Sequence, residues 1–211
     1  MAVGHTRCGD TRLGSDVTAP LQRLFIVRHG ETALSITRQH TGRTDLPLTA
    51  QGERDAVALA PRLTQFRFAA VLSSPLQRAQ RTAVLAGFGA ALQPDHDLLE
   101  WDYGAYEGRR TVDIRSEFPG WQLFEHGCPG GESPQAVGVR ADRVIARVRS
   151  IEGDVLMFAH QDILRAVAVR WLGLDVAKGR FFPLTTASIS ILGYDHSIDE
   201  PAFKLWNMSS N

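Results

Sequence analysis

The sequence predicts an α/β protein, a three-layer α/β/α sandwich with a mostly parallel central sheet. Two short runs, residues 24–27 and 155–159, are entirely apolar, which is typical of strands buried on both faces. Several other segments carry apolar residues at helical spacing. Buried strands that alternate with amphipathic helices favour a parallel-rich sheet covered on both sides.

The composition fits one globular domain. Of 211 residues, 44% are hydrophobic and 22% are charged, which are ordinary proportions for such a protein. Lys and Arg balance Asp and Glu at 23 each, so no net charge favours nucleic acid or a membrane surface, and we expect neither partner. Two cysteines are too few for a disulfide framework. We therefore expect residues 21–211 to form a single domain.

The N-terminal segment differs from the rest of the chain. Residues 1–20 are polar and contain three glycines, without the apolar stretch of a signal peptide. No segment of the sequence is apolar over the length that spans a bilayer. We therefore expect a flexible N-terminal tail and a cytoplasmic protein.

Capping residues predict where the first helices begin. Residues 35–47 are polar and irregular, and Thr49 can then cap a helix whose apolar residues recur at helical spacing. Residues 69–72 form a short strand. After it, Ser74-Pro75 supplies an N-cap and a first helical residue, which predicts a helix that carries Arg78.

The second half continues the alternation. Pro119-Gly120 ends one predicted helix, and Ser133-Pro134 begins a long one. The other expected elements are a weak strand at 91–92, a strand ending at Glu100, a helix at 110–118, a loop at 126–131, a helix through 164–171 to Gly173, a strand at 188–192 and a tail from Ser197 that could pack back on the domain.

Both wholly apolar strands are followed by a histidine, His29 and His160. If these strands are neighbours, the two imidazoles face one crevice at the carboxyl edge of the sheet, where open α/β sheets bind ligands. Arg28 precedes His29, and the helix with Arg78 would direct its partly positive N-terminus to the same edge. Two arginines, two histidines and a helix terminus suit a dianion such as a phosphate ester.

Phosphoryl transfer requires a nucleophile, charge stabilisation and a proton for the leaving oxygen. A neutral imidazole can attack phosphorus, the arginines and His160 can hold the oxygens, and Glu100 could supply the proton. Each residue could instead serve the fold alone. His29 would then be a loop histidine, Arg78 a surface arginine and Glu100 the cap of a turn.

These residues resemble the histidine phosphatase superfamily, the phosphoglycerate-mutase-like proteins, over almost the whole chain after residue 22. One Arg-His-Gly is a weak signal, whereas several motifs in the family's order are specific. These motifs are Arg28-His29-Gly30-Glu31-Thr32, Thr41-Gly42 with Asp45 and residues 47–49, residues 73–79 (Ser-Ser-Pro-Leu-Gln-Arg-Ala), Glu100 with Tyr103-Gly104, and Phe158-Ala159-His160.

The resemblance implies a phosphoglycerate-mutase-like fold and a phosphomonoesterase. It implies that His29 is phosphorylated, and that Glu100 acts first as general acid and then as base. It also implies that no metal or other cofactor is needed. The phosphate pocket would consist of Arg28, Arg78 and His160. The expected substrate-binding residues are Ser35, Thr41, Gly42, Tyr103 and Gln161.

Residues 101–108, 126–133 and 186–189 resemble a branch of broad-specificity acid phosphatases and sedoheptulose-1,7-bisphosphatases. Ser35 stands where mutases usually carry asparagine, and the interval 108–132 lacks their long substrate-enclosing insertion. An open site admits water, so we expect hydrolysis of a small phosphorylated metabolite, such as a sugar phosphate or bisphosphate. A phosphoglycerate mutase and a weakly active phospholigand-binding protein remain alternatives. The oligomeric state is open, a homodimer included.

The sequence departs from the family pattern after the second histidine. The family usually has glycine there, whereas this chain has Gln161-Asp162. Glycine permits close approach of the backbone to a ligand, so Gln161 would narrow the pocket. Asp162 would repel phosphate unless it caps the following helix.

Overall fold

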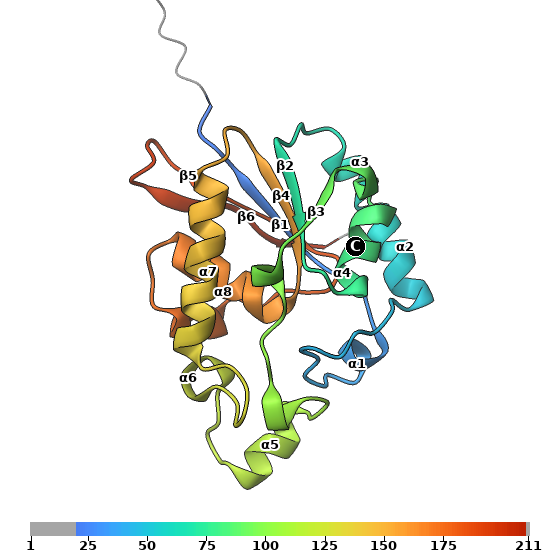
Figure 1. Cartoon of the computed structure of the whole chain (residues 1–211), viewed down its shortest axis with the longest axis vertical. Coiled ribbons are helices and arrows are strands. Elements are labelled where there is room, and N and C mark those ends of the chain that lie inside the picture. The colour runs from blue at the N-terminus through green and yellow to red at the C-terminus, as the bar shows by residue number, and fades with distance from the viewer. Residues whose placement is uncertain (1–19, 210–211) are drawn as a thin grey trace, which may run out of the picture.

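The computed structural model describes residues 20–209 as a sheet between two layers of helices (Figure 1). The strands, in the order β3-β2-β4-β1-β5-β6 across the sheet, are β1 (Leu24–Arg28), β2 (Ala70–Ser73), β3 (Leu92–Pro94), β4 (Val155–Ala159), β5 (Ile189–Tyr194) and β6 (Pro201–Met208). The first four in this order are parallel, β5 is antiparallel to β1, and β6 is antiparallel to β5. The predicted fold class is confirmed, with a mixed sheet. The predicted tail lies outside the described residues, except for Pro20.

Helices of the described chain cover both faces of this sheet. The helices are α1 (Ala33–Ile36), α2 (Ala50–Ala58), α3 (Ala60–Leu63), α4 (Gln77–Leu85), α5 (Thr111–Glu117), α6 (Leu123–His126), α7 (Pro134–Arg149) and α8 (Gln161–Trp171), with the 3₁₀ helices η1 (Gly89–Ala91), η2 (His96–Leu98), η3 (Gly104–Tyr106) and η4 (Val176–Phe181). Helices α7 and α8 lie on one face and α2, α3 and α4 on the other, whereas α1, α5 and α6 lie beyond the ends of the strands. Within residues 20–209, no helix combines the length and apolar character needed to cross a membrane.

The side chains of β1 alternate between two cores. Leu24 and Ile26 pack in the core beneath α7 and α8, whereas Phe25 and Val27 pack in the core beneath α2, α3 and α4. All four are almost completely buried. A strand covered on both faces has no solvent-facing position, which explains why its run is wholly apolar.

The pairing of β1 with β4 determines where the site forms. The two strands are parallel, and Arg28 lies opposite Ala159. His29 and His160 are therefore the next residues at the same edge, as the sequence predicted.

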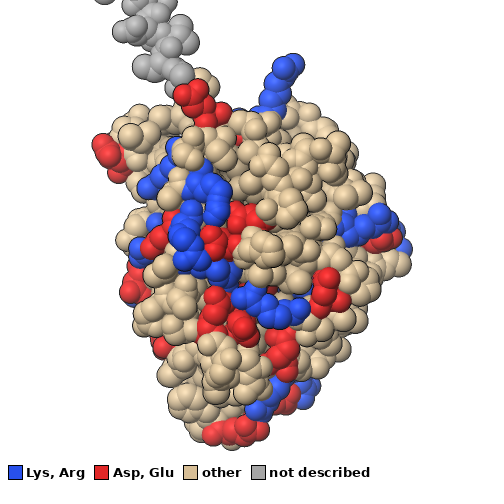
Figure 2. All heavy atoms as spheres, in the orientation of Figure 1, with Lys and Arg blue, Asp and Glu red and all other residues tan. Residues whose placement is uncertain are grey.

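Charges of both signs are interleaved on the face that carries α7 (Figure 2). Arg143 and Arg147 pair with Asp97, and Arg170 pairs with Asp142. The balance of charge in the sequence is thus also a local balance on this face, which suits a solvated surface rather than a polyanion-binding one.

The predicted start of α4 is wrong by two residues, about half a helical turn. The helix begins at Gln77 with Leu76 as its N-cap. Ser74 instead continues the extended chain beside β4, since its N–H donates to the Phe158 carbonyl, and it is completely buried. Its hydroxyl accepts from the Leu76 N–H in the turn that follows. Arg78 consequently lies in the first turn of α4, close to the sheet edge.

Two other predictions are corrected. Glu100 does not end a strand, because the chain forms the short helix η2 before it. In the segment that leads to Glu100, only Leu92–Pro94 pairs with β2. The segment after Ser197 is not a tail, because β6 pairs with β5 as the outermost strand. The side chains of β6 are mostly only half-buried, so its sequence lacks the pattern of a buried strand.

Gly52 in α2 and Gly30 in the loop after His29 let the helix pack directly on that loop. A Cβ on Gly52 would lie 2.3 Å from the carbonyl oxygen of Glu31, a backbone atom that cannot move aside cheaply. We expect Gly52→Ala to lower the free energy of unfolding by about 2 kcal/mol, measured by chemical denaturation.

Gly138→Ala is the matched control for Gly52→Ala. Gly138 lies within α7, and its Cβ would meet Val176 of η4 at an ordinary 3.5 Å. Alanine should therefore stabilise the helix by up to about 1 kcal/mol. Equal effects of the two substitutions would show that the contact between α2 and the loop is not tight.

Candidate active site

A cavity of about 490 Å³ opens at the carboxyl edge of the sheet. Its walls come from β1 and the following segment, from the loop around Glu100, and from the segments around α8 and β5. The lining residues are Arg28, His29, Glu31, Thr32, Ser35, Ile36, Arg38, Gln39, His40, Thr41, Glu100, Tyr103, Thr111, Gln161, Asp162, Leu184, Thr185 and Thr186.

His29 lies in this cavity with a defined proton position. Its Nδ1 is 2.7 Å from the carbonyl oxygen of Gly30, which can only accept a hydrogen bond. Nδ1 therefore carries the proton, and Nε2 has a free electron pair. Burial, together with the positive charges of Arg78 and Arg28, lowers the pKa of His29 well below its ordinary value. The imidazole is consequently neutral near pH 7 and can act as a nucleophile.

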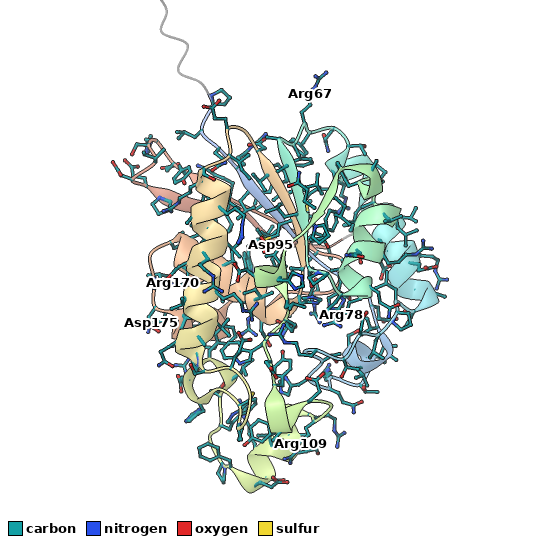
Figure 3. The ribbon with its side chains drawn as sticks, viewed as in Figure 1. Arg67, Arg78, Asp95, Arg109, Arg170 and Asp175 are labelled. Atoms are coloured by element: carbon teal, nitrogen blue, oxygen red, sulfur yellow. The ribbon has the colours of Figure 1, made fainter. Side chains whose placement is uncertain are left out.

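Arg78, labelled in Figure 3, is completely buried and lies against His160. Its Nε donates to Nδ1 of His160 at 3.0 Å, and its Nη atoms donate to the carbonyl oxygens of Thr41, Gly42 and Thr44. Four of its five N–H groups are thus used, and one has no partner among the described residues.

His160 is held between Arg78 and Ser74. Because its Nδ1 accepts from Arg78, its Nε2 carries the proton and donates to the Ser74 hydroxyl at 2.7 Å. Burial and the Arg78 charge lower the pKa of His160 well below its ordinary value. The ring centroids of His160 and His29 are 5.1 Å apart. The predicted residues therefore converge, although Arg78 and His160 lie behind the cavity wall.

Arg28 is a cation that faces the cavity. One Nη donates to the carbonyl oxygen of Leu184, while the buried Nε has no hydrogen-bond partner among the described residues. Burial lowers the pKa of Arg28, yet a guanidinium stays protonated in proteins. Arg28 as a whole is only half-buried, but a buried donor atom without a partner on a cation favours an anionic ligand.

Glu100 reaches the cavity from the loop before Trp101. Its carboxylate accepts from the backbone N–H groups of Trp101, Asp162 and Ile163, the last two in the first turn of α8. The side chain is almost fully buried. Burial, together with the negative charge of Asp162, raises the pKa of Glu100 to about 7. Such a group can both donate and accept a proton near neutral pH.

Four of the five predicted substrate-binding residues, Ser35, Thr41, Tyr103 and Gln161, line the cavity. The Ser35 hydroxyl is engaged in capping α1, where it bonds to the backbone of Thr32. Gly42 lies behind the wall, since its carbonyl accepts from Arg78 and its N–H donates to Glu107. Gly42 thus supports the site without facing the cavity.

Other lining residues escaped the sequence analysis. Arg38, His40 and Thr185 come from loops with no recognisable pattern, and Thr111 is the first residue of α5. His40 and Thr111 meet only because the chain pairs at an isolated bridge beside them, which places His40 Nε2 3.2 Å from the Thr111 hydroxyl. Thr186 lies in residues 186–189, which resemble the phosphatase branch, and this resemblance was the sequence signal that pointed to it.

Asp162 does not cap α8 as considered from the sequence. His160 is the N-cap, and the Asp162 carboxylate accepts from the Tyr103 hydroxyl at 2.6 Å and pairs with Arg165 at 2.7 Å. Its charge is therefore compensated, and its repulsion of a bound phosphate is reduced.

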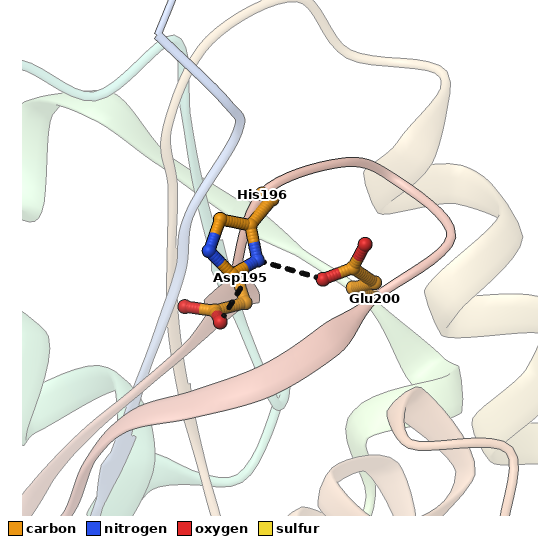
Figure 4. Close-up of side chains that lie close together, drawn as sticks. All are labelled: Asp195, His196 and Glu200. Carbon is orange, nitrogen blue, oxygen red and sulfur yellow. Dashed lines mark hydrogen bonds and ion pairs between the residues drawn. The ribbon is translucent and has the colours of Figure 1, made fainter.

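A cluster of potential metal ligands lies elsewhere. Among residues 20–209, only Asp195, His196 and Glu200 bring three such side chains close together (Figure 4). They are exposed on the turn between β5 and β6, and none of them lines the cavity.

Fold and cavity together describe an α/β protein whose cavity, with Arg28 in its wall, suits an anionic group. The chain belongs to the histidine phosphatase superfamily (branch 1), whose family model matches residues 24–209. The predicted family is confirmed, and so is the predicted enzyme class, a phosphoric monoester hydrolase of the histidine phosphatase type. A phosphate-ester substrate fits this membership.

Relatives are similar over most of the chain. An acid phosphatase of Mycobacterium tuberculosis is 40% identical over 184 residues, 85% of this chain and 90% of the relative. A sedoheptulose 1,7-bisphosphatase of Saccharomyces cerevisiae is 33% identical over 232 residues, 87% of this chain and 83% of the relative. The solved structure of an open reading frame of M. tuberculosis has a TM-score of 0.83 at 38% identity, and the match covers 90% of this chain and 99% of that one.

Proposed function

We propose that residues 21–211 form a single metal-independent phosphomonoesterase domain, which hydrolyses small phosphorylated metabolites through a phosphohistidine on His29. The observation that carries this proposal is a buried, neutral imidazole with a free Nε2, next in the chain to the half-buried Arg28, whose buried Nε has no partner among residues 20–209. A nucleophile beside an unsatisfied cationic donor suits attack on a phosphate dianion.

The reaction proceeds in two steps. Nε2 of His29 attacks phosphorus, the bond from phosphorus to the ester oxygen breaks, and Glu100 gives its proton to the departing alkoxide. A water molecule then attacks the phosphohistidine while Glu100 takes a proton from it. This releases inorganic phosphate and restores His29. Arg28 and the remaining N–H of Arg78 stabilise charge on the phosphate oxygens.

The walls around the phosphate position suit a polyhydroxylated leaving group. Their polar groups are mainly hydroxyls and amides, from Thr41, Thr111, Thr185, Tyr103 and Gln161. Such groups exchange hydrogen bonds with sugar hydroxyls. We therefore propose sugar phosphates and bisphosphates as substrates. The names of the relatives, an acid phosphatase and a sugar bisphosphatase, support this choice.

A substrate panel tests the proposal. Phosphate release is measured with p-nitrophenyl phosphate, sugar mono- and bisphosphates and phosphoglycerates, in the presence of EDTA. We expect turnover with EDTA and faster release from one sugar phosphate than from the aryl ester. Faster interconversion of phosphoglycerates than phosphate release would instead indicate a mutase. Ligand-induced thermal stabilisation without any turnover would indicate a phospholigand-binding protein.

Glu100→Gln tests the proton donor. We expect the rate with glycerol phosphate, a poor leaving group, to fall about 10²- to 10⁴-fold, because glutamine cannot protonate the alkoxide. The formation of phosphohistidine from p-nitrophenyl phosphate should fall much less, because p-nitrophenolate departs without a proton. Burst kinetics by rapid mixing measure this step.

Glu117→Gln is the matched control, since Glu117 is exposed and bonds to Arg109 at the surface. It should change neither rate. An equal loss with both esters in Glu100→Gln would assign Glu100 a structural role.

A further inference from the structure

Asp162 is a buried charge that the proposed reaction does not use. Only 2% of the residue is exposed. Its Oδ2 accepts from the Tyr103 hydroxyl at 2.6 Å, and its Oδ1 accepts from Arg165 at 2.7 Å and from Gln161 at 3.3 Å. A carboxylate with three donors is fixed in position and in its ionised form.

Glu100 and Asp162 meet at the first turn of α8. The Glu100 carboxylate accepts from the N–H of Asp162, at 3.2 and 3.1 Å to its two oxygens, and from the N–H of Ile163 at 3.0 Å. The side chains of Arg165, Tyr103 and Gln161 donate to Asp162, whereas Glu100 receives only backbone donors. The two acids therefore share one helix terminus but have unequal partners.

We propose that Asp162 is a positioning residue, whose fixed negative charge holds Glu100 in the protonated form that can donate to the leaving group. This rests on the role proposed above for Glu100 as general acid. Two carboxyl groups buried at the same helix terminus do not both ionise readily, and the one with cationic and hydroxyl donors keeps the charge.

The directions of the two pKa values agree with this geometry. Burial alone would raise the pKa of Asp162, but Arg165 and the Tyr103 hydroxyl outweigh it and lower that pKa below its ordinary value. Burial and the Asp162 charge act together to raise the pKa of Glu100.

Several other charged or titratable groups face the pair and are unchanged by a substitution at Asp162. Positive groups favour ionisation of Glu100, so they oppose the effect of Asp162. These surrounding groups are Arg28 and His29 after β1, His40 in the loop after α1, Arg78 from α4, Tyr103 from the loop after Glu100, Arg140 from α7, and His160 and Arg165 at α8.

The pH dependence of kcat/KM with glycerol phosphate, whose leaving group needs a proton, tests the inference in Asp162→Asn. This parameter reports ionisations of the free enzyme, and activity falls as the general acid loses its proton. Without the Asp162 charge, Glu100 loses its proton more readily, so we expect the high-pH limb to move down by about one pH unit. Asp162→Glu, which restores the charge, should return the limb toward the wild-type position.

Asp142→Asn is the matched control, because this acid pairs with Arg170 at the surface. Its profile should overlay that of the wild type. Should Asp162→Asn fail to fold, Asp162→Ala removes the same charge from a helical position that accepts alanine. An unmoved limb in a folded, charge-free variant, together with an unshifted titration of Glu100 in the measurement that follows, would overturn the inference.

A second measurement does not depend on activity. The carboxyl carbon of Glu100 is followed by NMR in the full-length protein labelled with ¹³C at glutamate, and the signal missing from Glu100→Gln assigns it. We expect its titration midpoint to fall by about one pH unit in Asp162→Asn. A shifted midpoint with an unmoved kinetic limb would contradict only the role of Glu100 as general acid, and the effect of Asp162 on Glu100 would stand. An unshifted midpoint would contradict the role of Asp162.

Discussion

His29→Ala should abolish phosphate release, with kcat lower by about four orders of magnitude or more. Alanine has no nitrogen to attack phosphorus, and the remaining residues can bind phosphate but cannot form the covalent intermediate. The measurement is phosphate release from p-nitrophenyl phosphate, together with intact-protein mass spectrometry after rapid acid-free quenching. Wild-type protein should gain the mass of one phosphoryl group, and His29→Ala should gain none.

The control for this substitution is His196→Ala. His196 is exposed on the turn between β5 and β6, away from the cavity residues, so turnover and phosphoryl trapping should match the wild type. His29→Ala should still bind inorganic phosphate, because Arg28 and Arg78 remain. If His29→Ala retained substantial turnover, the phosphohistidine mechanism would be wrong, although membership of the superfamily would stand.

The sequence predicted that His29 and His160 meet if their strands are neighbours, and the parallel pairing of β1 with β4 meets that condition. Both histidines follow strands so apolar that each must be covered on two faces, and parallel buried strands deliver their next residues to one edge. The resemblance then assigned the surrounding residues expected roles. Neither step required knowledge of how distant loops pack.

The surroundings of Glu100 could not be predicted in the same way. Its carboxylate is held by the N–H groups of Asp162 and Ile163, which are more than 60 positions away in the chain. The sequence suggested a strand end at Glu100, because Leu98 and Leu99 are apolar, but tertiary packing produced a 3₁₀ turn instead. Local pattern does not encode such long-range contacts.

Arg78 shows the same limit in another form. The sequence placed its guanidinium at a helix terminus, facing an anion. In the folded chain most of its donors are taken by backbone carbonyls of residues 41–44, a segment with no regular structure that the sequence predicted only as irregular. Arg78 therefore organises the loop and orients His160 before any ligand arrives.

This arrangement predicts that Arg78→Ala damages stability and activity together. Alanine leaves the carbonyls of Thr41, Gly42 and Thr44 and Nδ1 of His160 without donors inside the protein. Each unsatisfied buried group costs roughly 1–3 kcal/mol, and partial relaxation should limit the total loss of unfolding free energy to about 3–5 kcal/mol. We expect chemical denaturation to show this loss, and kcat/KM to fall by about 10³-fold or more.

Two variants separate the geometry of Arg78 from its charge. Arg78→Lys keeps the charge but cannot reproduce a planar fork that serves four acceptors, so it should recover only a minor part of the stability and activity. Arg81→Lys makes the same exchange one turn along α4, where the arginine is exposed and bonds only to Glu53. It should change neither quantity, because exposed pairs contribute little. If Arg78→Lys behaved like Arg81→Lys, positive charge alone would suffice, and the hydrogen bonds to residues 41–44 would not hold the site together.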